Sequence, residues 1–410
     1  MNVAALLAEH GSPLWLVDLD RVRERWRGFG DAFDACWPDV EIAYSYKTNR
    51  LPAILRTLAA EGAGHEVVCA AEYALALDAI GADGSRIVVN GPAKPDVLLA
   101  RAGHDGALVI ADAADELERA ARAGVRRVGL RVALPGVGVE PTRFGIASSE
   151  LAAAARRARD LGLHVEALSA HLVSTGFDRP LAEAKRPGTA IVVHWPPEPD
   201  RHADAAGHLG ALATQLGVDS VDLGGGLPAA PAVTGHGRAI GTALRSSGFA
   251  GRLVLEPGRA IVTDAVALAC TVVGVKELAD GTRCVVADAG TNLLPGALWG
   301  PPRIDALDGG ASAGPALVSG PLCLNVDVLH PAVELPRVAV GDALLVRDVG
   351  AYQQTQSTQF GDLRPAVVVF DEGRWTSCAR RETLEDLLAA DAEAVLTAIG
   401  LPAGHEEEQP

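Results

Sequence analysis

The stretch SVDLGGGLPAAPAVTGHGRAIGTALRSSGFAGRLVLEPGR (220–259) joins two short apolar runs through a longer segment of helical composition. The runs SVDLG (220–224) and RLVLE (252–256) carry the aliphatic residues that favour strands. Between them, GRAIGTALRSSG (237–248) ends in a glycine, which commonly terminates a helix. A strand, a helix and a second strand in this order predict a βαβ unit with parallel strands.

The same alternation runs back toward the N-terminus. Eight strands separated by helical segments favour a closed (β/α)8 TIM barrel, an α/β fold, over an open sheet. The segment 175–200 is longer than an ordinary loop and predicts an extra strand or a lid. The six further strands are expected at EIAYSYK (41–47), HEVVC (65–69), RIVVN (86–90), ALVI (107–110), RVGLRV (127–132) and HVEALSAH (164–171).

After about residue 262 the pattern becomes all-β, with runs such as AVALACTVVGVKEL and PAVVVFDEGRW separated by Gly, Pro and Asp turns. The early run PLWLVDLD (13–20) predicts a strand with no helix ahead of it, which would complete this β domain. We therefore expect an N-terminal strand in 1–21, a barrel over 22–262 and a C-terminal β domain over 263–410. The last segment, ETLEDLLAADAEAVLTAIG (382–400), predicts a terminal helix.

The composition excludes several classes of protein. With 49% hydrophobic and 21% charged residues among 410, the chain can bury a core and is not a disordered protein. The 36 basic against 52 acidic residues give a net charge of −16, which argues against a nucleic-acid partner. Six scattered cysteines form no Cys-x-x-Cys pair, so no metal site is expected. Without a basic leader or a long apolar run, we expect a cytoplasmic protein with no membrane contact.

Several polar residues stand where the predicted barrel strands end, the edge at which such barrels place their active sites. Taken singly, each is typical of an ordinary residue: a solvated lysine, a core histidine, a tight glycine turn. Together they supply a lysine for a Schiff base, a glycine-rich turn for a phosphate and a carboxylate for a pyridine nitrogen, which indicates a pyridoxal 5'-phosphate (PLP) site. These residues are Lys47, Glu66, Arg131, His171, Gly224, Gly225, Gly226 and Glu256, with Arg259 close by.

Six motifs in order resemble the ornithine/diaminopimelate decarboxylase family, the PLP enzymes of fold type III with an alanine-racemase-like barrel and a C-terminal β domain. The resemblance extends from about residue 13 to 378, over nearly the whole chain, and the six motifs lie within this range. Because the motifs keep the family's order, the resemblance implies a PLP-dependent carboxy-lyase that releases carbon dioxide from an amino acid. The motifs are AYSYKTN, HLVSTG, VDLGGGLP, LEPGR, GPLC and RDVGAY.

The resemblance implies a role for each matching residue. Lys47 would be the Schiff-base lysine, His171 the residue that stacks on the PLP ring, and Cys323 the acid that reprotonates the substrate carbon. Cys323 would reach the partner subunit's site, which implies a head-to-tail homodimer. The cofactor-binding set would be Lys47, Glu66, Arg131, His171, Ser174, Gly224, Gly225, Gly226, Glu256, Gly258, Arg259 and Tyr352.

The chain departs from the best-known members around the substrate. Where members that act on basic amino acids have an acid after the cysteine, this chain has Leu324, and an unpaired ammonium beside leucine is costly. Leu293 and Pro295 stand where the diaminopimelate branch has an Asp and an Arg. Lysine, ornithine and diaminopimelate are therefore disfavoured as substrates.

Segments such as HLVSTGFDRP and WPPEPD instead resemble decarboxylases of siderophore and other specialised-metabolite pathways, which act on amino-acid conjugates. A cluster of neutral hydrogen-bonding side chains would suit a large polar substrate, although the same residues are also typical of an ordinary surface loop. They are Gln353, Gln354, Thr355, Gln356 and Thr358.

Three alternatives remain open. The first is a diaminopimelate or other free amino-acid decarboxylase. The second is an amino-acid racemase, which would need a second acid/base such as a tyrosine; Tyr352 already stands in the phosphate motif. The third is an inactive decarboxylase-like regulator, which the presence of the complete set of site residues disfavours.

Overall fold

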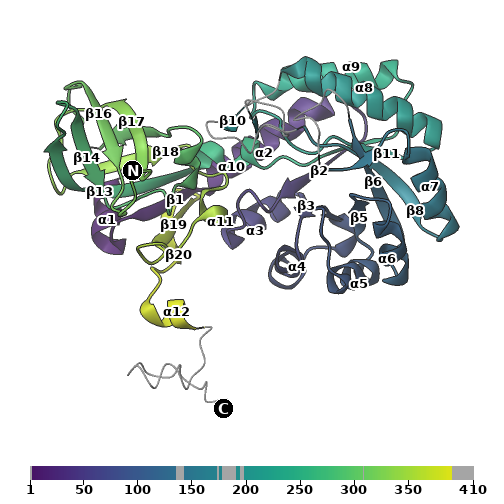
Figure 1. The fold of residues 1–410 in the computed structure, drawn as a ribbon, viewed down its shortest axis with the longest axis horizontal. Coiled ribbons are helices and arrows are strands. Elements are labelled where there is room, and N and C mark those ends of the chain that lie inside the picture. Colours follow the sequence, from purple (N-terminus) through teal and green to yellow (C-terminus); the bar gives the residue numbers. More distant parts are fainter. Residues whose placement is uncertain are drawn as a thin grey trace, which may run out of the picture. The chain divides into compact units, whose positions relative to one another are not determined.

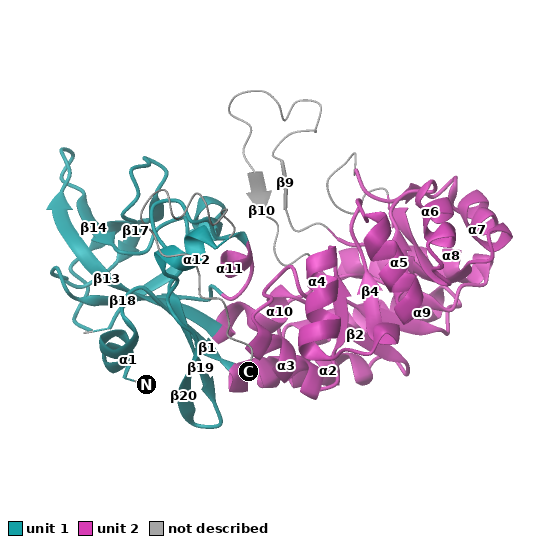
Figure 2. Ribbon diagram, turned by 90° about the horizontal axis from the view of Figure 1, so that it is seen from below, with its two compact units in different colours: residues 1–18, 266–349, 356–410 teal, residues 19–265, 350–355 magenta. Residues whose placement is uncertain are grey.

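The computed structural model describes residues 2–134, 143–172, 175–177, 191–193, 198–307 and 309–389. The chain forms two compact units (Figure 2). Unit 1 comprises residues 1–18, 266–349 and 356–410, and unit 2 comprises residues 19–265 and 350–355. Within the described ranges, no helix is both long enough and apolar enough to cross a membrane.

Unit 2 is a closed parallel barrel. Each strand pairs in parallel with the next along the chain, and β12 pairs with β2 to close the ring. The eight barrel strands of the described chain coincide with the eight that the sequence predicts, so the TIM-barrel prediction is confirmed. They are β2 (Val40–Ser45), β3 (Gly64–Val67), β4 (Ile87–Val89), β5 (Leu108–Ala111), β6 (Arg127–Ala133), β8 (His164–Ser169), β11 (Ser220–Asp222) and β12 (Arg252–Leu255).

Helices cover the outside of the barrel strands (Figure 1). Left-handed glycines end several of them; Gly106 and Gly217, with φ of 75° and 63°, follow α5 and α8. The helices are α2 (Leu19–Asp34), α3 (Pro52–Ala60), α4 (Ala70–Ala74), α5 (Asp96–Asp105), α6 (Glu116–Arg122), α7 (Leu151–Asp160), α8 (Pro199–Leu216), α9 (Val233–Ser246) and α10 (Arg259–Val262).

The long segment 175–200 does contain extra strands. β9 (Thr175–Phe177) pairs with β10 (Ile191–Val193) in an antiparallel ribbon. Residues 178–190 and 194–197 of this segment lie outside the described residues. A two-residue strand, β7 (Ile146–Ala147), adds to β6.

Unit 1 is a β domain, and the N-terminal strand completes it as predicted. β1 lies between β13, to which it is antiparallel, and β19, to which it is parallel (Figure 1). Apolar side chains of these strands form one core cluster. The strands are β1 (Leu14–Asp18), β13 (Val266–Glu277), β14 (Arg283–Ala287), β15 (Arg303–Ala306), β16 (Pro315–Ser319), β17 (Val328–Glu334), β18 (Ala343–Arg347), β19 (Ala366–Asp371) and β20 (Arg374–Ala379).

The expectation of no helix ahead of the first strand is wrong. α1 (Val3–His10) precedes β1, and the Asn2 side chain accepts a hydrogen bond from the Ala5 amide at 3.1 Å. Val3 and Leu6 pack into the β core, so a helix too short to persist alone is stabilised by burial. At the other end, α12 (Leu384–Leu388) occupies the start of the predicted terminal helix; residues 390–400 are outside the described residues.

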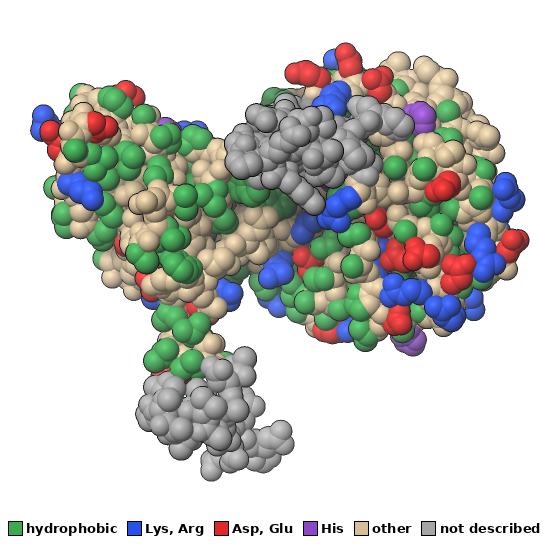
Figure 3. All heavy atoms as spheres, viewed as in Figure 1, with side chains coloured by type: hydrophobic (Ala, Val, Ile, Leu, Met, Phe, Trp, Pro, Cys, Tyr) green, Lys and Arg blue, Asp and Glu red, His purple; other side chains and the backbone are tan. Residues whose placement is uncertain are grey.

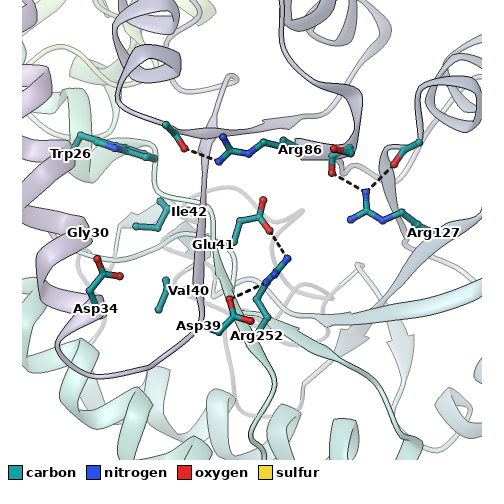
Figure 4. A pocket seen from close by; sticks show the side chains of 13 residues that line it. Trp26, Gly30, Asp34, Asp39, Val40, Glu41, Ile42, Arg86, Arg127 and Arg252 are labelled. Carbon is teal, nitrogen blue, oxygen red and sulfur yellow. Dashed lines mark hydrogen bonds and ion pairs between the residues drawn. The ribbon is translucent and has the colours of Figure 1, made fainter.

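The N-terminal ends of the barrel strands surround a hollow of about 780 Å³ (Figure 4). Two of the arginines that line it form ion pairs with carboxylates. Arg127 donates two hydrogen bonds to Glu166, at 2.6 and 2.8 Å, and Arg252 pairs with Asp39 and Glu41. Because these ion pairs occupy the cations, this end of the barrel is stabilised rather than left open for a charged ligand.

Candidate active site

The predicted site residues of unit 2 meet at the carboxyl ends of the barrel strands. Lys47 lies in the turn after β2, Glu66 lies within β3, and His171 follows β8. The glycine turn 224–226 follows β11, and Glu256 follows β12. Since parallel strands end at one edge of the barrel, residues as far apart in the sequence as Lys47 and Glu256 are brought together there.

A continuous chain of hydrogen bonds connects the lysine to the two glutamates. Lys47 Nζ donates to Glu66 Oε2 at 2.5 Å. The Asn90 side-chain amide donates to Glu66 Oε1 at 3.1 Å and to Glu256 Oε1 at 2.6 Å. Glu66 and Glu256 are almost completely buried.

Burial and these contacts have opposing effects on the pKa values of Lys47, Glu66 and Glu256. Desolvation alone would lower the pKa of Lys47, but the charges of Glu66 and Glu256 raise it above its usual value. Burial would raise the pKa of Glu66, yet the Lys47 charge holds it below its usual value. Burial, together with the charges of Asp222 and Glu66, raises the pKa of Glu256 well above its usual value. Lys47 and Glu66 therefore form an ion pair, while burial and the neighbouring acids favour the protonated form of Glu256.

The glycine turn packs directly against His171. The Gly225 amide donates to His171 Nδ1 at 3.1 Å, and the Gly224 amide donates to Asp222 Oδ1 at 2.8 Å. A Cβ on Gly224, whose φ is 61°, would lie 2.4 Å from His171 Nδ1, so this position requires glycine. Burial, with the nearby charges of Lys47 and Arg131, lowers the pKa of His171 to about 3, so the ring is neutral and Nδ1 can accept.

Gly258, Arg259 and Tyr352 gather beside the Lys47 turn. A Cβ on Gly258 would lie 1.9 Å from Thr48 Oγ1, so only glycine fits there. The Arg259 guanidinium lies 5.1 Å from the centre of the Tyr352 ring. The Tyr352 amide donates to the Thr48 carbonyl at 2.8 Å, although φ is 65° at this tyrosine. This contact holds the 350–355 segment against the barrel.

Arg131 is held at the same rim by two contacts. Its guanidinium lies 3.3 Å from Asp112 Oδ1 and 4.4 Å from the centre of the Phe144 ring. Glu116 accepts from the Asp112 amide at 2.9 Å and from the buried Lys94 at 3.1 Å. Arg131 is therefore fixed by a buried network rather than left mobile.

Two predicted residues are not brought into this cluster by the structure. Ser174 lies outside the described residues. Cys323 belongs to unit 1, in the loop between β16 and β17, and is exposed. Asp327, the acid closest to it in the sequence, accepts hydrogen bonds from Thr291 and Leu322 and so helps to fix the conformation of this loop.

Sequence reasoning missed Asn90 and Asp222 at the site. Both stand at strand ends, Asn90 directly after β4 and Asp222 at the end of β11, so the rule that selected Lys47 and Glu256 applied equally to them.

Two members of the glutamine-rich segment contact the lysine turn. Gln354 accepts a hydrogen bond from Asn49 at 2.9 Å, and the Thr355 hydroxyl donates to the Lys47 carbonyl at 3.0 Å. These two side chains therefore brace the turn that carries Lys47.

The residues present fit PLP. The buried carboxyls of Asp222 and Glu256 are the kind of pair that a protonated pyridine ring would stabilise. The Thr48 hydroxyl is buried without a hydrogen-bond partner among the described residues, next to Gly258 and close to Arg259. A phosphate would compete with Asp222 and His171 for the amides of the glycine turn, since both already accept from it.

Known proteins resemble this chain over almost its full length. A family model for the pyridoxal-binding domain of pyridoxal-dependent decarboxylases matches residues 19–186. The diaminopimelate decarboxylase of Deinococcus radiodurans is 31% identical over 399 residues, covering 93% of this chain and 96% of that protein. That of Methanothermobacter thermautotrophicus is 30% identical over 426 residues, covering 94% and 93%. The crystal structure of Helicobacter pylori diaminopimelate decarboxylase complexed with L-lysine has a TM-score of 0.82 at 22% identity, covering 98% of this chain and 100% of that one.

The matches to these two decarboxylases cover 93% and 94% of this chain, so they include both the barrel and the β domain. This confirms the resemblance drawn from the motifs and the cofactor that it implies. The chain belongs to the pyridoxal-dependent decarboxylases of the ornithine/diaminopimelate family, and it is a carboxy-lyase that uses PLP.

Proposed function

We propose that this enzyme decarboxylates a free amino acid at a site built around Lys47, with diaminopimelate as the first candidate substrate. The observation that carries the proposal is the buried chain from Lys47 through Glu66 and Asn90 to Glu256. The named relatives support the choice of substrate, because both curated ones are diaminopimelate decarboxylases.

The residues of the site have distinct roles in this proposal. PLP, when bound, supplies an electron sink for the electrons that remain as carbon dioxide leaves. The Glu66 carboxylate accepts the hydrogen bond from the Lys47 amine, and Glu256, whose protonated form is favoured, is suited to pair with the pyridine nitrogen. His171 is neutral and offers its flat face, while Gly258, Arg259 and Tyr352 would hold the phosphate.

A second candidate is a substrate whose distal end is not a free ammonium, such as an amino-acid conjugate. Leu324 is 43% exposed, and the nearby Asp327 is occupied by Thr291 and Leu322, so this loop offers no free carboxylate for an amine. The relatives named above do not support the siderophore branch. Only the residues of this loop therefore support an amino-acid conjugate as the substrate.

We also infer a head-to-tail homodimer in which Cys323 serves the partner's site. Every large hydrophobic residue that is strongly exposed in the described chain lies in unit 1, except Val97. On the face seen in Figure 3, hydrophobic side chains are frequent on unit 1, and charged side chains are frequent on unit 2. Two of the exposed residues, Leu324 and Val326, belong to the Cys323 loop itself, which supports an interface there. Further exposed apolar residues of unit 1 include Leu298, Trp299 and Phe360.

Borohydride reduction of the PLP-loaded protein, followed by peptide mapping, tests the site. The chain has four lysines, Lys47, Lys94, Lys185 and Lys276, and we expect the pyridoxyl label on Lys47 alone. Lys47→Ala should lose the label, while Lys276→Ala, an exposed position in β13, should keep it. A label that persists in Lys47→Ala would overturn the assignment.

Carbon dioxide release then separates the two substrate candidates. The assay compares diaminopimelate, lysine and ornithine with the same amino acids acylated by citrate on the distal amine. Turnover of free diaminopimelate supports the first candidate. Turnover of conjugates alone supports the second, and the Leu324 loop would explain it.

A further inference from the structure

Asn90 is the only side chain that the described structure shows hydrogen bonded to both buried glutamates of the site. Its amide donates to Glu66 Oε1 and to Glu256 Oε1, while its own backbone amide donates to the Val67 carbonyl at 2.8 Å. The backbone contact fixes Asn90 at the end of β4, and the side chain then spans from β3 to the end of β12. The two glutamates are joined through this one group.

The Asn90 side-chain amide can donate to two neighbouring carboxyl groups without adding a charge. Glu66 and Glu256 would repel each other if both were ionised, and Lys47 reaches only Glu66 by hydrogen bond. A side-chain amide carries two N–H donors on one nitrogen and no charge, so it can serve both carboxyls at once. A hydroxyl has one donor, and an aspartate at this place would add another acid.

We propose that Asn90 is a positioning residue of the decarboxylase site, whose amide holds the carboxyls of Glu66 and Glu256 in place relative to Lys47. The inference rests on the proposed roles of Lys47 and Glu256. The glutamate that faces the lysine and the glutamate that would face the pyridine nitrogen are then set by one common donor. A substitution that removes the Asn90 amide should therefore change the positions of both glutamate side chains.

The test titrates the buried carboxyls of the apoprotein by infrared difference spectroscopy. Glu66→Gln and Glu256→Gln assign the two carboxyl bands. A hydrogen bond from Asn90 favours the ionised form of each carboxyl group and so lowers its pKa, so Asn90→Ala should shift both midpoints upward, by about one pH unit or more. The other titratable groups facing the pair, Lys47, Asp222, His171 and Glu72, remain in every Asn90 variant.

Ser220→Ala is the matched control. Ser220 is buried like Asn90, and its hydroxyl donates to the Glu166 carbonyl at 2.8 Å, toward the opposite end of the barrel. This variant should leave both carboxyl midpoints unchanged. Equal midpoints in wild type and Asn90→Ala, or an equal shift in Ser220→Ala, would overturn the inference.

The holoenzyme gives a second measurement. We expect Asn90→Ala to release PLP about 10- to 100-fold faster than wild type or Ser220→Ala, followed by loss of the visible band in the presence of a PLP scavenger. If Asn90→Ala does not fold, Asn90→Asp keeps the size of the side chain; unchanged carboxyl midpoints in that variant would also overturn the inference. A wild type that takes up no PLP on Lys47 would refute the proposed function, while the apoprotein titration would still decide the role of Asn90.

Discussion

At the scale of single residues, Asp222 connects the glycine turn to the acidic centre of the site. One of its oxygens accepts from the Gly224 amide, and the side chain has no measurable exposure. Burial raises its pKa from the usual 3.8 to about 6. The folded apoprotein therefore binds this proton more tightly than the unfolded chain does.

The stability from Asp222 is fully present below about pH 4 and is lost as the pH rises through about 6, a change of about 3 kcal/mol. Asp222→Asn keeps an acceptor for Gly224 and removes the ionisation. We expect its apoprotein to unfold at a higher temperature than wild type at pH 8 and at the same temperature at pH 4. Circular dichroism melts measure this.

Asp31→Asn, at an exposed position on α2, is the control and should show no such pH-dependent gain. His171 and His202, whose pKa values burial lowers to about 3 and about 4, destabilise all three proteins alike as the pH falls below about 6.5. Melting temperatures that differ by the same amount at both pH values would contradict the role given to Asp222.

At the scale of elements, two glycines let α9 approach α2 closely. A Cβ on Gly237 would lie 2.9 Å from the Ala32 carbonyl oxygen, and one on Gly241 would lie 2.8 Å from that of Cys36. Both obstacles are backbone atoms at the end of α2 and just beyond it. The helices pack at this separation because the contact face of α9 has no side chain at these positions.

Gly237→Ala and Gly241→Ala should each lower the free energy of unfolding by about 1–3 kcal/mol, because the helices must move apart. Gly235 lies on the same helix with nothing within 4 Å of its added Cβ. Gly235→Ala should therefore raise stability by about 0.5–1 kcal/mol through helix propensity alone. Urea titrations measure the free energy of unfolding of the three variants. An increase in all three would mean that the packing of α9 against α2 does not require glycine at positions 237 and 241.

At the scale of the whole molecule, the chain leaves unit 1 after β1, forms the barrel, and returns to unit 1 at β13. The site residues at the barrel rim belong to unit 2, while the exposed Cys323 belongs to unit 1. A head-to-tail dimer would supply Cys323 to the partner's site and cover the apolar residues around it.

Mixing two inactive variants tests this arrangement. In a dimer with shared sites, one Lys47→Ala subunit and one Cys323→Ala subunit form one doubly defective site and one intact site. Random exchange of equal amounts should restore about a quarter of wild-type turnover. Light scattering with size exclusion checks the dimer itself, and Trp299→Ser should shift it toward monomer. Failure of the mixture to exceed its separate components would contradict shared sites.

Local patterns in the sequence predicted the barrel strands because each strand is a short apolar run between helical segments that end in glycine. The same patterns placed Lys47, Glu66, His171 and Glu256 at one rim, since parallel strands must end on the same side. α1 was missed because its stability comes from packing on a β core that includes β1 and strands much later in the chain.

Which of these side chains interact depends on how the barrel folds. Asn90 bonds to Glu256 across 166 positions, and His171 accepts from Gly225 across 54. Such contacts depend on how the closed barrel sets neighbouring strand ends, which no local pattern records. The pKa values of Asp222 and Glu256 are likewise set by burial and by each other. Local residue patterns therefore predict the fold and the candidate rim, whereas closure of the barrel sets the hydrogen bonds and charges of the site.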